Sequence, residues 1–324
     1  MESPPSLYAS RREIPFTVKG LKIYCSIIGD PNAPKRIGHG MGFKSRMFDI
    51  EQSLFRLTDP DTCIISIKLP NTFRNINFIN TYNDVVKAFF FSEQSPLFQH
   101  GQAPDKIVGL THSTSGLLVE ENLLYPKNNA FAADRFHGFV HLAPFFDLAN
   151  ASRQYDGMLK SVYGLYAANF PDVFLGDGLC DKAFLAITGQ SCPFTSSRRK
   201  PTHGQTLEIR NFAWEYQELL ETIIQNEDEA RISQLPRHII IGDADTVSCP
   251  KTAQWFCDHI PSASIEVTPG ASHYLLSQEK EVPARVREAI TFMETGRPLI
   301  TRPPIPRTSP RSQILDPTLA YGVV

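Results

Sequence analysis

The sequence lacks any apolar run of the roughly 18–20 residues that a membrane-spanning helix needs. Its N-terminal stretch, MESPPSLYASRREIPF, contains no apolar segment of signal-peptide length. We therefore expect a cytoplasmic protein with no integral membrane segment. The formal net charge is only −2, which argues against the broad basic surface that binds nucleic acid or anionic membranes. The expected partners are small molecules, with no nucleic acid.

Metal and cofactor motifs are also missing. The cysteines show no C-x-x-C spacing, so the sequence indicates neither a zinc site nor a thioredoxin-like motif, and in a reducing compartment they should be free thiols. There is no P-loop and no glycine-rich dinucleotide fingerprint. We therefore expect no metal and no cofactor. The cysteines are Cys25, Cys63, Cys180, Cys192, Cys249 and Cys257.

The sequence does contain apolar, β-branched runs that alternate with helical patterns. With 42% apolar residues it can bury a sizeable core. The runs are apolar throughout rather than alternating, which is typical of parallel strands covered on both faces. The predicted fold class is α/β, with a mostly parallel central sheet and helices on both faces. Expected are a hairpin over 16–30, strands at 62–69, 106–110, 136–144, 237–243 and 264–270, and helices at 81–91, 251–259 and 283–294.

The segment 146–230 interrupts this alternation. It is rich in aromatic residues that recur at spacings close to three and four, which predicts helices. We interpret it as a helical cap, or lid, inserted into a core formed by 1–145 and 231–296. Most of its aromatic side chains should pack inside the cap, and some could line a pocket. The last stretch, 297–324, contains six prolines and is expected to be extended.

A candidate nucleophile lies in KIVGLTHSTSGLLVEENLL, residues 106–124, which predicts a strand, a sharp turn at Ser113 and a helix. A serine hydroxyl needs a histidine base that is oriented by a carboxylate. Asp245 follows the apolar strand in RHIIIGDADTVSCP, and His273 follows another strand in VTPGASHYLL. The chain order Ser, Asp, His is that of nucleophile-elbow enzymes. Asp243 follows the same strand and is the alternative acid.

The turn GHGMG, residues 38–42, could stabilise an oxyanion. Backbone N–H groups in a glycine-rich turn after a strand suit a tetrahedral intermediate. We expect the N–H of Met41 to act together with the N–H of Thr114, directly after the candidate nucleophile. The neighbouring histidines, His39 and His112, are expected to pack or hydrogen-bond rather than to titrate in catalysis.

On the motifs HGMG, THSTSG, GDAD and GASH, residues 16–295 resemble the α/β-hydrolase superfamily, most closely its cap-bearing serine-aminopeptidase-like and monoacylglycerol-lipase-like esterases. The resemblance implies Ser113 as the nucleophile, His273 as general base and then acid, and Asp245 as the orienting acid. It also implies that the cap is the variable lid that sets substrate choice.

Two features depart from the family pattern. The usual elbow is G-x-S-x-G, whereas this chain has Thr111 two places before the serine, Ser115 two places after it, and Gly116 one place late. Small residues are favoured there because the strand and the helix approach closely. Before HGMG the only strongly apolar residue is Ile37, so we expect that strand to be short or displaced.

The sequence therefore predicts a serine hydrolase that acts on a carboxylic ester or thioester with an apolar acyl or aromatic group, through an acyl-enzyme. An acyltransferase or a cyclising thioesterase would use the same residues and stays open. A third alternative is a non-catalytic ligand-binding protein, since fold does not establish activity. The expected partner is a small apolar ester, thioester or related acyl substrate, and a homodimer is left open.

Overall fold

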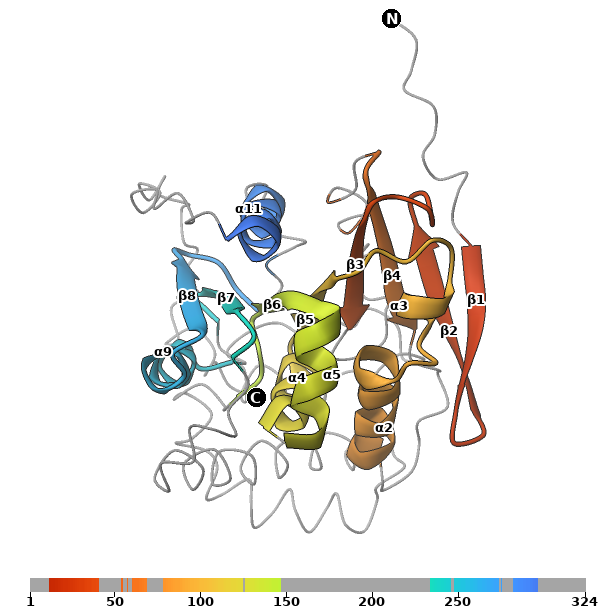
Figure 1. Ribbon diagram of the computed structural model, residues 1–324. Coiled ribbons are helices and arrows are strands. Elements are labelled where there is room, and N and C mark those ends of the chain that lie inside the picture. The colour runs from red at the N-terminus through yellow and green to blue at the C-terminus, as the bar shows by residue number, and fades with distance from the viewer. Residues whose placement is uncertain are drawn as a thin grey trace, which may run out of the picture.

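In the part of the chain that the structure describes, eight strands form one sheet in the order β1-β2-β4-β3-β5-β6-β7-β8 (Figure 1). The first two pairings, β1 with β2 and β2 with β4, are antiparallel, and all later pairings are parallel. The strands are β1 (Arg12–Val18), β2 (Leu21–Ile28), β3 (Lys35–Gly40), β4 (Thr62–Lys68), β5 (Ile107–His112), β6 (Phe136–Leu142), β7 (Arg237–Gly242) and β8 (Ala263–Thr268).

The computed structural model describes residues 12–40, 54, 57, 60–68, 78–124, 126–146, 234–245, 248–273, 275 and 282–296. Its helices are α2 (Phe78–Phe91), α3 (Pro96–Gln99), α4 (Thr114–Leu124), α5 (Pro126–Arg135), α9 (Pro250–His259) and α11 (Val282–Thr295). The predicted cap, apart from Phe146, and the proline-rich tail lie outside the described residues, so both stay predictions.

The predicted α/β fold class is confirmed. The strand predicted at 237–243 is β7, whose six residues are all buried, as are the six of β5. Helix α11 lies on one side of the sheet, and α2, α4 and α9 lie on the other (Figure 1). Both faces are therefore covered, which explains why these strands carry continuous apolar runs rather than an alternating pattern.

The predicted N-terminal hairpin is also present. Lys19 and Gly20 connect β1 to β2, and their φ angles are +46° and +80°. Positive φ at both central residues matches the right-handed twist of the flanking strands, and glycine adopts it at no steric cost. This hairpin forms one edge of the sheet.

Strand β3 corrects the expectation of a short or displaced strand. It has six residues and lies between β4 and β5 in the middle of the sheet. Its buried Arg36 donates hydrogen bonds to the backbone carbonyls of Leu97 and Pro31, both at 2.7 Å. Burial lowers the pKa of Arg36. Arg36 therefore occupies a central strand because backbone carbonyls, one of them 61 residues away, accept hydrogen bonds from both of its terminal nitrogens.

The glycines of β3 make room for aromatic packing. A Cβ atom on Gly40 would lie 2.9 Å from a ring atom of Phe90, and one on Gly38 would lie 2.8 Å from the side chain of Leu97. Phe90 in turn packs edge-on against Phe139 of β6, with ring centroids 5.7 Å apart. The glycines before position 41 are therefore needed for close packing of α2 against the sheet.

Candidate active site

The turn between β5 and α4 holds Ser113 in a left-handed conformation, with φ of +58°. A non-glycine residue rarely adopts this region, which costs on the order of 1–3 kcal/mol. Three backbone hydrogen bonds hold the turn: the N–H of Ser113 donates to Leu142 at 3.0 Å, and its carbonyl accepts from Gly116 at 3.0 Å and from Phe145 at 3.1 Å. The strained conformation is thus fixed from both the helix and the end of β6.

The structure brings Ser113, His273 and Asp245 together, and we call these three residues the elbow group. The Oγ atom of Ser113 lies 3.0 Å from Nε2 of His273, and Nδ1 of His273 lies 3.0 Å from Oδ2 of Asp245. All three residues are buried. A carboxylate accepts the Nδ1–H, so Nε2 is left to accept the proton of the serine hydroxyl.

The two candidate acids occupy different environments. Asp245 is buried and contacts His273. Asp243 is exposed, and its Oδ1 accepts a hydrogen bond from the backbone N–H of Gly270. The structure therefore places Asp245, and not Asp243, beside the histidine.

Sequence reasoning missed a fourth residue, Ser248. Its backbone N–H donates to Oδ1 of Asp245 at 2.8 Å, and its Oγ lies 3.4 Å from Nδ1 of His273. The hydroxyl donates to the carbonyl of Ala143 at 3.0 Å. Its lone pairs therefore face the histidine. The sequence did contain a signal, because Ser248 lies three residues after Asp245 in a turn. The side chain of an aspartate in a turn typically accepts a hydrogen bond from a backbone N–H a few residues later.

The two neighbouring histidines are buried and neutral. Burial, together with His273, lowers the pKa of His112 to about 4, and burial together with His112 lowers the pKa of His39 to about 3. The Nε2–H of His112 donates to the backbone carbonyl of His273 at 3.0 Å, and Nδ1 of His39 lies 2.9 Å from Oγ of Ser66. These contacts agree with the packing and hydrogen-bonding roles expected from the sequence.

No family model and no curated sequence matches this chain. Solved structures do. A soluble variant of monoglyceride lipase from Saccharomyces cerevisiae has a TM-score of 0.60 at 16% identity, over 91% of this chain and 100% of that one. The monoacylglycerol lipase of Paleococcus ferrophilus has a TM-score of 0.54 at 12% identity, over 84% of this chain and 98% of that one. Est1E from Butyrivibrio proteoclasticus has a TM-score of 0.51 at 13% identity, over 87% of this chain and 98% of that one.

The chain has the α/β-hydrolase fold. The fold that the sequence motifs implied is thereby confirmed. At these identities the similarity establishes the architecture, so the chemistry must be argued from the site itself.

Of the two candidate oxyanion donors, Thr114 lies within the described residues. Thr114 is buried at the first position of α4, where backbone N–H groups have no partner within the helix. Met41 lies outside the described residues, and its role stays a prediction. Gly40, directly before it, is held in place because its carbonyl accepts a hydrogen bond from Oγ of Ser115 at 2.8 Å. Ser115 thus ties the end of β3 to the elbow.

The unusual elbow sequence of this α/β-hydrolase fold has a steric explanation. Thr111 is fully buried, and its Oγ1 lies 2.7 Å from Nδ1 of His141. A Cβ atom on Gly116 would lie 3.2 Å from that oxygen and 2.8 Å from Cβ of Pro144. Gly116, one place later than the glycine of the family pattern, therefore provides the room that Thr111 needs.

Neither a metal cluster nor a membrane span is found in the part of the chain that the structure describes. No three or more His, Cys, Asp or Glu side chains are grouped there to hold a metal ion. Within the same ranges, no helix is both long and apolar enough to cross a membrane.

Proposed function

We propose that this chain is a serine hydrolase that cleaves a carboxylic ester or thioester through an acyl-enzyme on Ser113. The observation that carries the proposal is the strained serine, with φ of +58°, whose Oγ lies 3.0 Å from Nε2 of His273. A turn serine without a reaction to perform gains nothing from that strain. The acid that orients the histidine is present at 3.0 Å.

In the first half-reaction, Oγ of Ser113 attacks the carbonyl carbon of the substrate while its proton passes to Nε2 of His273. Asp245 accepts the Nδ1–H and stabilises the imidazolium. His273 then gives its proton to the departing alkoxide or thiolate, and the acyl group stays on Oγ as an ester. In the second half-reaction, water attacks this ester while His273 takes the proton from water. The acid leaves, and the proton returns to Ser113.

The negative oxygen of each tetrahedral intermediate needs donors already in position. The N–H of Thr114 has the required place, directly after the nucleophile at the positive end of α4. The N–H of Met41 would supply the second donor. The hydrogen bond from Ser115 to Gly40 supports this assignment, because it fixes the residue before Met41 against the elbow. Loss of one such donor typically reduces kcat about 10²- to 10³-fold.

For the substrate, we propose an apolar acyl or aromatic group held under the cap. The aromatic sequence of 146–230 suits such a group better than a highly charged one. Among the neighbours of the same fold, the yeast monoglyceride lipase was solved with a substrate analog, and another is the thioesterase domain from the curacin biosynthetic pathway, at a TM-score of 0.51 and 14% identity. These structural neighbours support either an ester or a thioester as the substrate.

The alternatives differ in what happens to the acyl group. An acyltransferase or cyclising thioesterase would form the same acyl-enzyme and pass it to an alcohol or amine, depending on whether the cap excludes water. A ligand-binding protein would need no acyl-enzyme. The short contacts within the elbow group favour the catalytic alternatives over this one.

Labelling with a fluorophosphonate tests the proposal. The reagent forms a phosphorus–oxygen bond with an activated serine and releases fluoride. We expect wild-type protein to be labelled and the Ser113→Ala variant to remain unlabelled, while Ser92→Ala, which removes a hydroxyl directly after α2 and outside the elbow group, stays labelled. Folded wild-type protein that resists labelling would rule out both catalytic alternatives. Product analysis with added alcohols and amines would then separate hydrolysis from transfer.

A further inference from the structure

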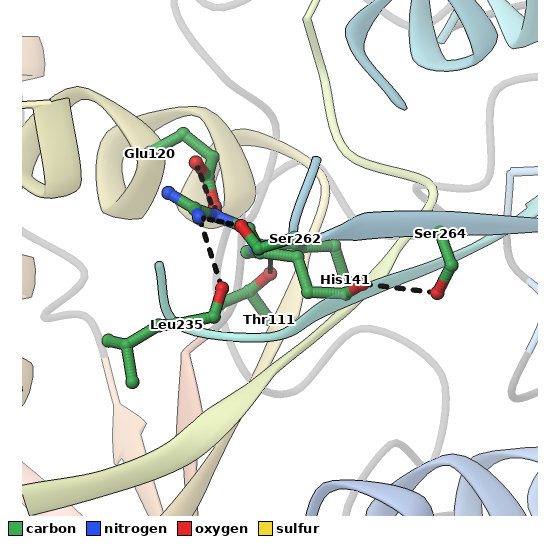
Figure 2. Close-up of polar contacts among 7 residues, drawn as sticks. Thr111, Glu120, His141, Leu235, Ser262 and Ser264 are labelled. Carbon is green, nitrogen blue, oxygen red and sulfur yellow. Dashed lines mark hydrogen bonds and ion pairs between the residues drawn. The ribbon is translucent and has the colours of Figure 1, made fainter. Parts of the chain in front are cut away.

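A second group of polar side chains lies beneath the elbow, with no role in the proposed mechanism. It consists of four residues that are each at most 1% exposed: Thr111 of β5, Glu120 of α4, His141 of β6 and Arg237 of β7. Figure 2 labels the first three of them. We call these four residues the buried cluster. Their contacts connect four elements of the core. One end of the cluster is Thr111, two places before Ser113.

The hydrogen bonds of the buried cluster have a defined direction. Burial alone would raise the pKa of Glu120, but the charge of Arg237 and the hydrogen bonds from His141 and Arg237 outweigh it, so the pKa is lowered and the carboxyl is ionised. Nε of Arg237 donates to both carboxylate oxygens at 3.1 Å, and Nε2–H of His141 donates to one at 2.9 Å. In the neutral tautomer that carries its proton on Nε2, His141 accepts at Nδ1, and the hydroxyl of Thr111 donates to it at 2.7 Å.

Arg237 is itself anchored at the far end of the cluster. Its Nη1 donates to the carbonyl of Leu235 at 3.1 Å and to Oγ of Ser262 at 2.8 Å (Figure 2). The chain of contacts therefore runs from fixed groups near β7 and β8 to the threonine. The four members of the buried cluster are shielded from solvent, and Ser262 at the far end of the chain of contacts is half-buried.

Stability alone does not account for this arrangement. A buried ion pair costs so much desolvation that apolar side chains of similar volume often do as well or better. Two members of the cluster lie in one row of the sheet: Thr111 pairs with Gly40 on one side and with His141 on the other. Gly40 lies directly before Met41, and Thr111 lies two places before Ser113, where the proposed chemistry demands accurate placement.

We propose that Thr111 is a positioning residue for the nucleophile, and that it acts through His141 and Glu120. The hydroxyl anchors the end of β5 to β6, while Ser115 anchors the start of α4 to β3. The strained turn at Ser113 is thus held on both sides. The family pattern has glycine at this position, which offers no side chain as an anchor. This chain has Thr111, whose side chain is hydrogen-bonded. The inference rests on the proposed function, because only a reacting serine needs such placement.

Two substitutions of Thr111 distinguish the effect of its hydroxyl from the effect of its branched shape. Thr111→Val keeps the branched shape and removes the hydroxyl, and Thr111→Ser keeps the hydroxyl. We expect fluorophosphonate labelling of Thr111→Val to be at least tenfold slower than wild type, because misplacement by about 1 Å can cost about 10²-fold. Thr111→Ser should label within about threefold of wild type. Equal rates for the valine variant and wild type would overturn the proposal.

A double variant tests whether the threonine acts through the histidine. His141→Phe keeps the parallel ring packing on Phe139, at 6.0 Å between centroids, but loses both nitrogens. Adding Thr111→Val to His141→Phe should slow labelling by less than twofold beyond His141→Phe alone. A full additional tenfold loss would show that the hydroxyl acts by another route.

Crystal structures of the valine and serine variants give a readout that needs no activity. In Thr111→Val we expect the distance from Ser113 Oγ to His273 Nε2 to lengthen beyond hydrogen-bond range, and in Thr111→Ser to stay near 3.0 Å. Unchanged geometry in the valine variant would refute the positioning role. If wild-type protein were not labelled at all, the proposed function would fail, and these structures alone would decide whether Thr111 positions the serine.

Discussion

The elbow group and the buried cluster are both built from a hydroxyl, an imidazole and a carboxylate, yet their carboxylates are held in different ways. Asp245 accepts a hydrogen bond from the backbone N–H of Ser248, which is a dipole without net charge. Glu120 accepts from the guanidinium of Arg237, which carries a full positive charge. A dipole orients a carboxylate and leaves its charge available to an imidazolium, whereas a cation neutralises it. The same groups can thus serve proton transfer in one place and rigid support in another.

The largest expected difference comes from neutralising the acid of the elbow group. Asp245→Asn should reduce kcat by about 10⁴-fold, because an amide that donates to Nδ1 selects the wrong tautomer of His273. Asp243→Asn is the matched control: its amide oxygen can still accept from Gly270, and activity should stay near wild type. Steady-state kinetics on a chromogenic ester measures both. A large loss in Asp243→Asn with little in Asp245→Asn would reverse the assignment of the acid.

In the buried cluster the same kind of change should affect stability most. Glu120→Gln leaves the guanidinium of Arg237 buried without its counter-charge, and we expect the free energy of unfolding to fall by about 3–5 kcal/mol. Urea denaturation followed by circular dichroism measures this. The double variant Glu120→Met with Arg237→Leu removes both charges and should recover most of the loss. A stability within 1 kcal/mol of wild type for Glu120→Gln would show that the ion pair is not what fixes the cluster.

Ser248 should have a smaller effect on the elbow group. In Ser248→Ala the lone pairs facing Nδ1 of His273 are removed, so the imidazolium is less stabilised. We expect kcat to fall about tenfold. Ser248→Thr keeps the hydroxyl and should keep kcat near the wild-type value. An unchanged kcat in Ser248→Ala would mean that Ser248 supports only the backbone.

The sequence predicted those parts of the molecule whose signal is local. The run of three isoleucines in β7 predicted a buried strand, and the turn after β5 predicted the elbow at Ser113. Strand β3 was misjudged because Arg36 appears polar in sequence. Its partners are carbonyls of Leu97 and Gln102, more than 60 residues away in the chain. Long-range satisfaction of a polar group leaves no local pattern.

The buried cluster was missed for the same reason. Glu120 belongs to the stretch GLLVEENLL, where an acidic residue normally predicts the solvent side of a helix. It is instead fully buried, and its partner Arg237 is 117 residues away. The catalytic candidates were easier to predict because their order and their places after strands are set by the fold. Their supporting contacts depend on which side chains meet in three dimensions.

Near neutral pH the smallest predicted effect concerns the neutral histidines beside the elbow group. The pKa of His112 is lowered to about 4 by burial and by His273, so the unfolded chain, with an ordinary value near 6.5, binds a proton that the folded protein does not. Stability is therefore full above pH 6.5 and falls as the pH drops toward 4. His112→Gln keeps a donor but cannot titrate, and should reduce the slope of unfolding free energy by about 1.4 kcal/mol per pH unit in that window. His39→Gln should do the same down to about pH 3, where the pKa of His39 lies. Urea titrations at several pH values measure both slopes, and a slope that neither substitution changes would mean that these imidazoles are already charged in the folded protein.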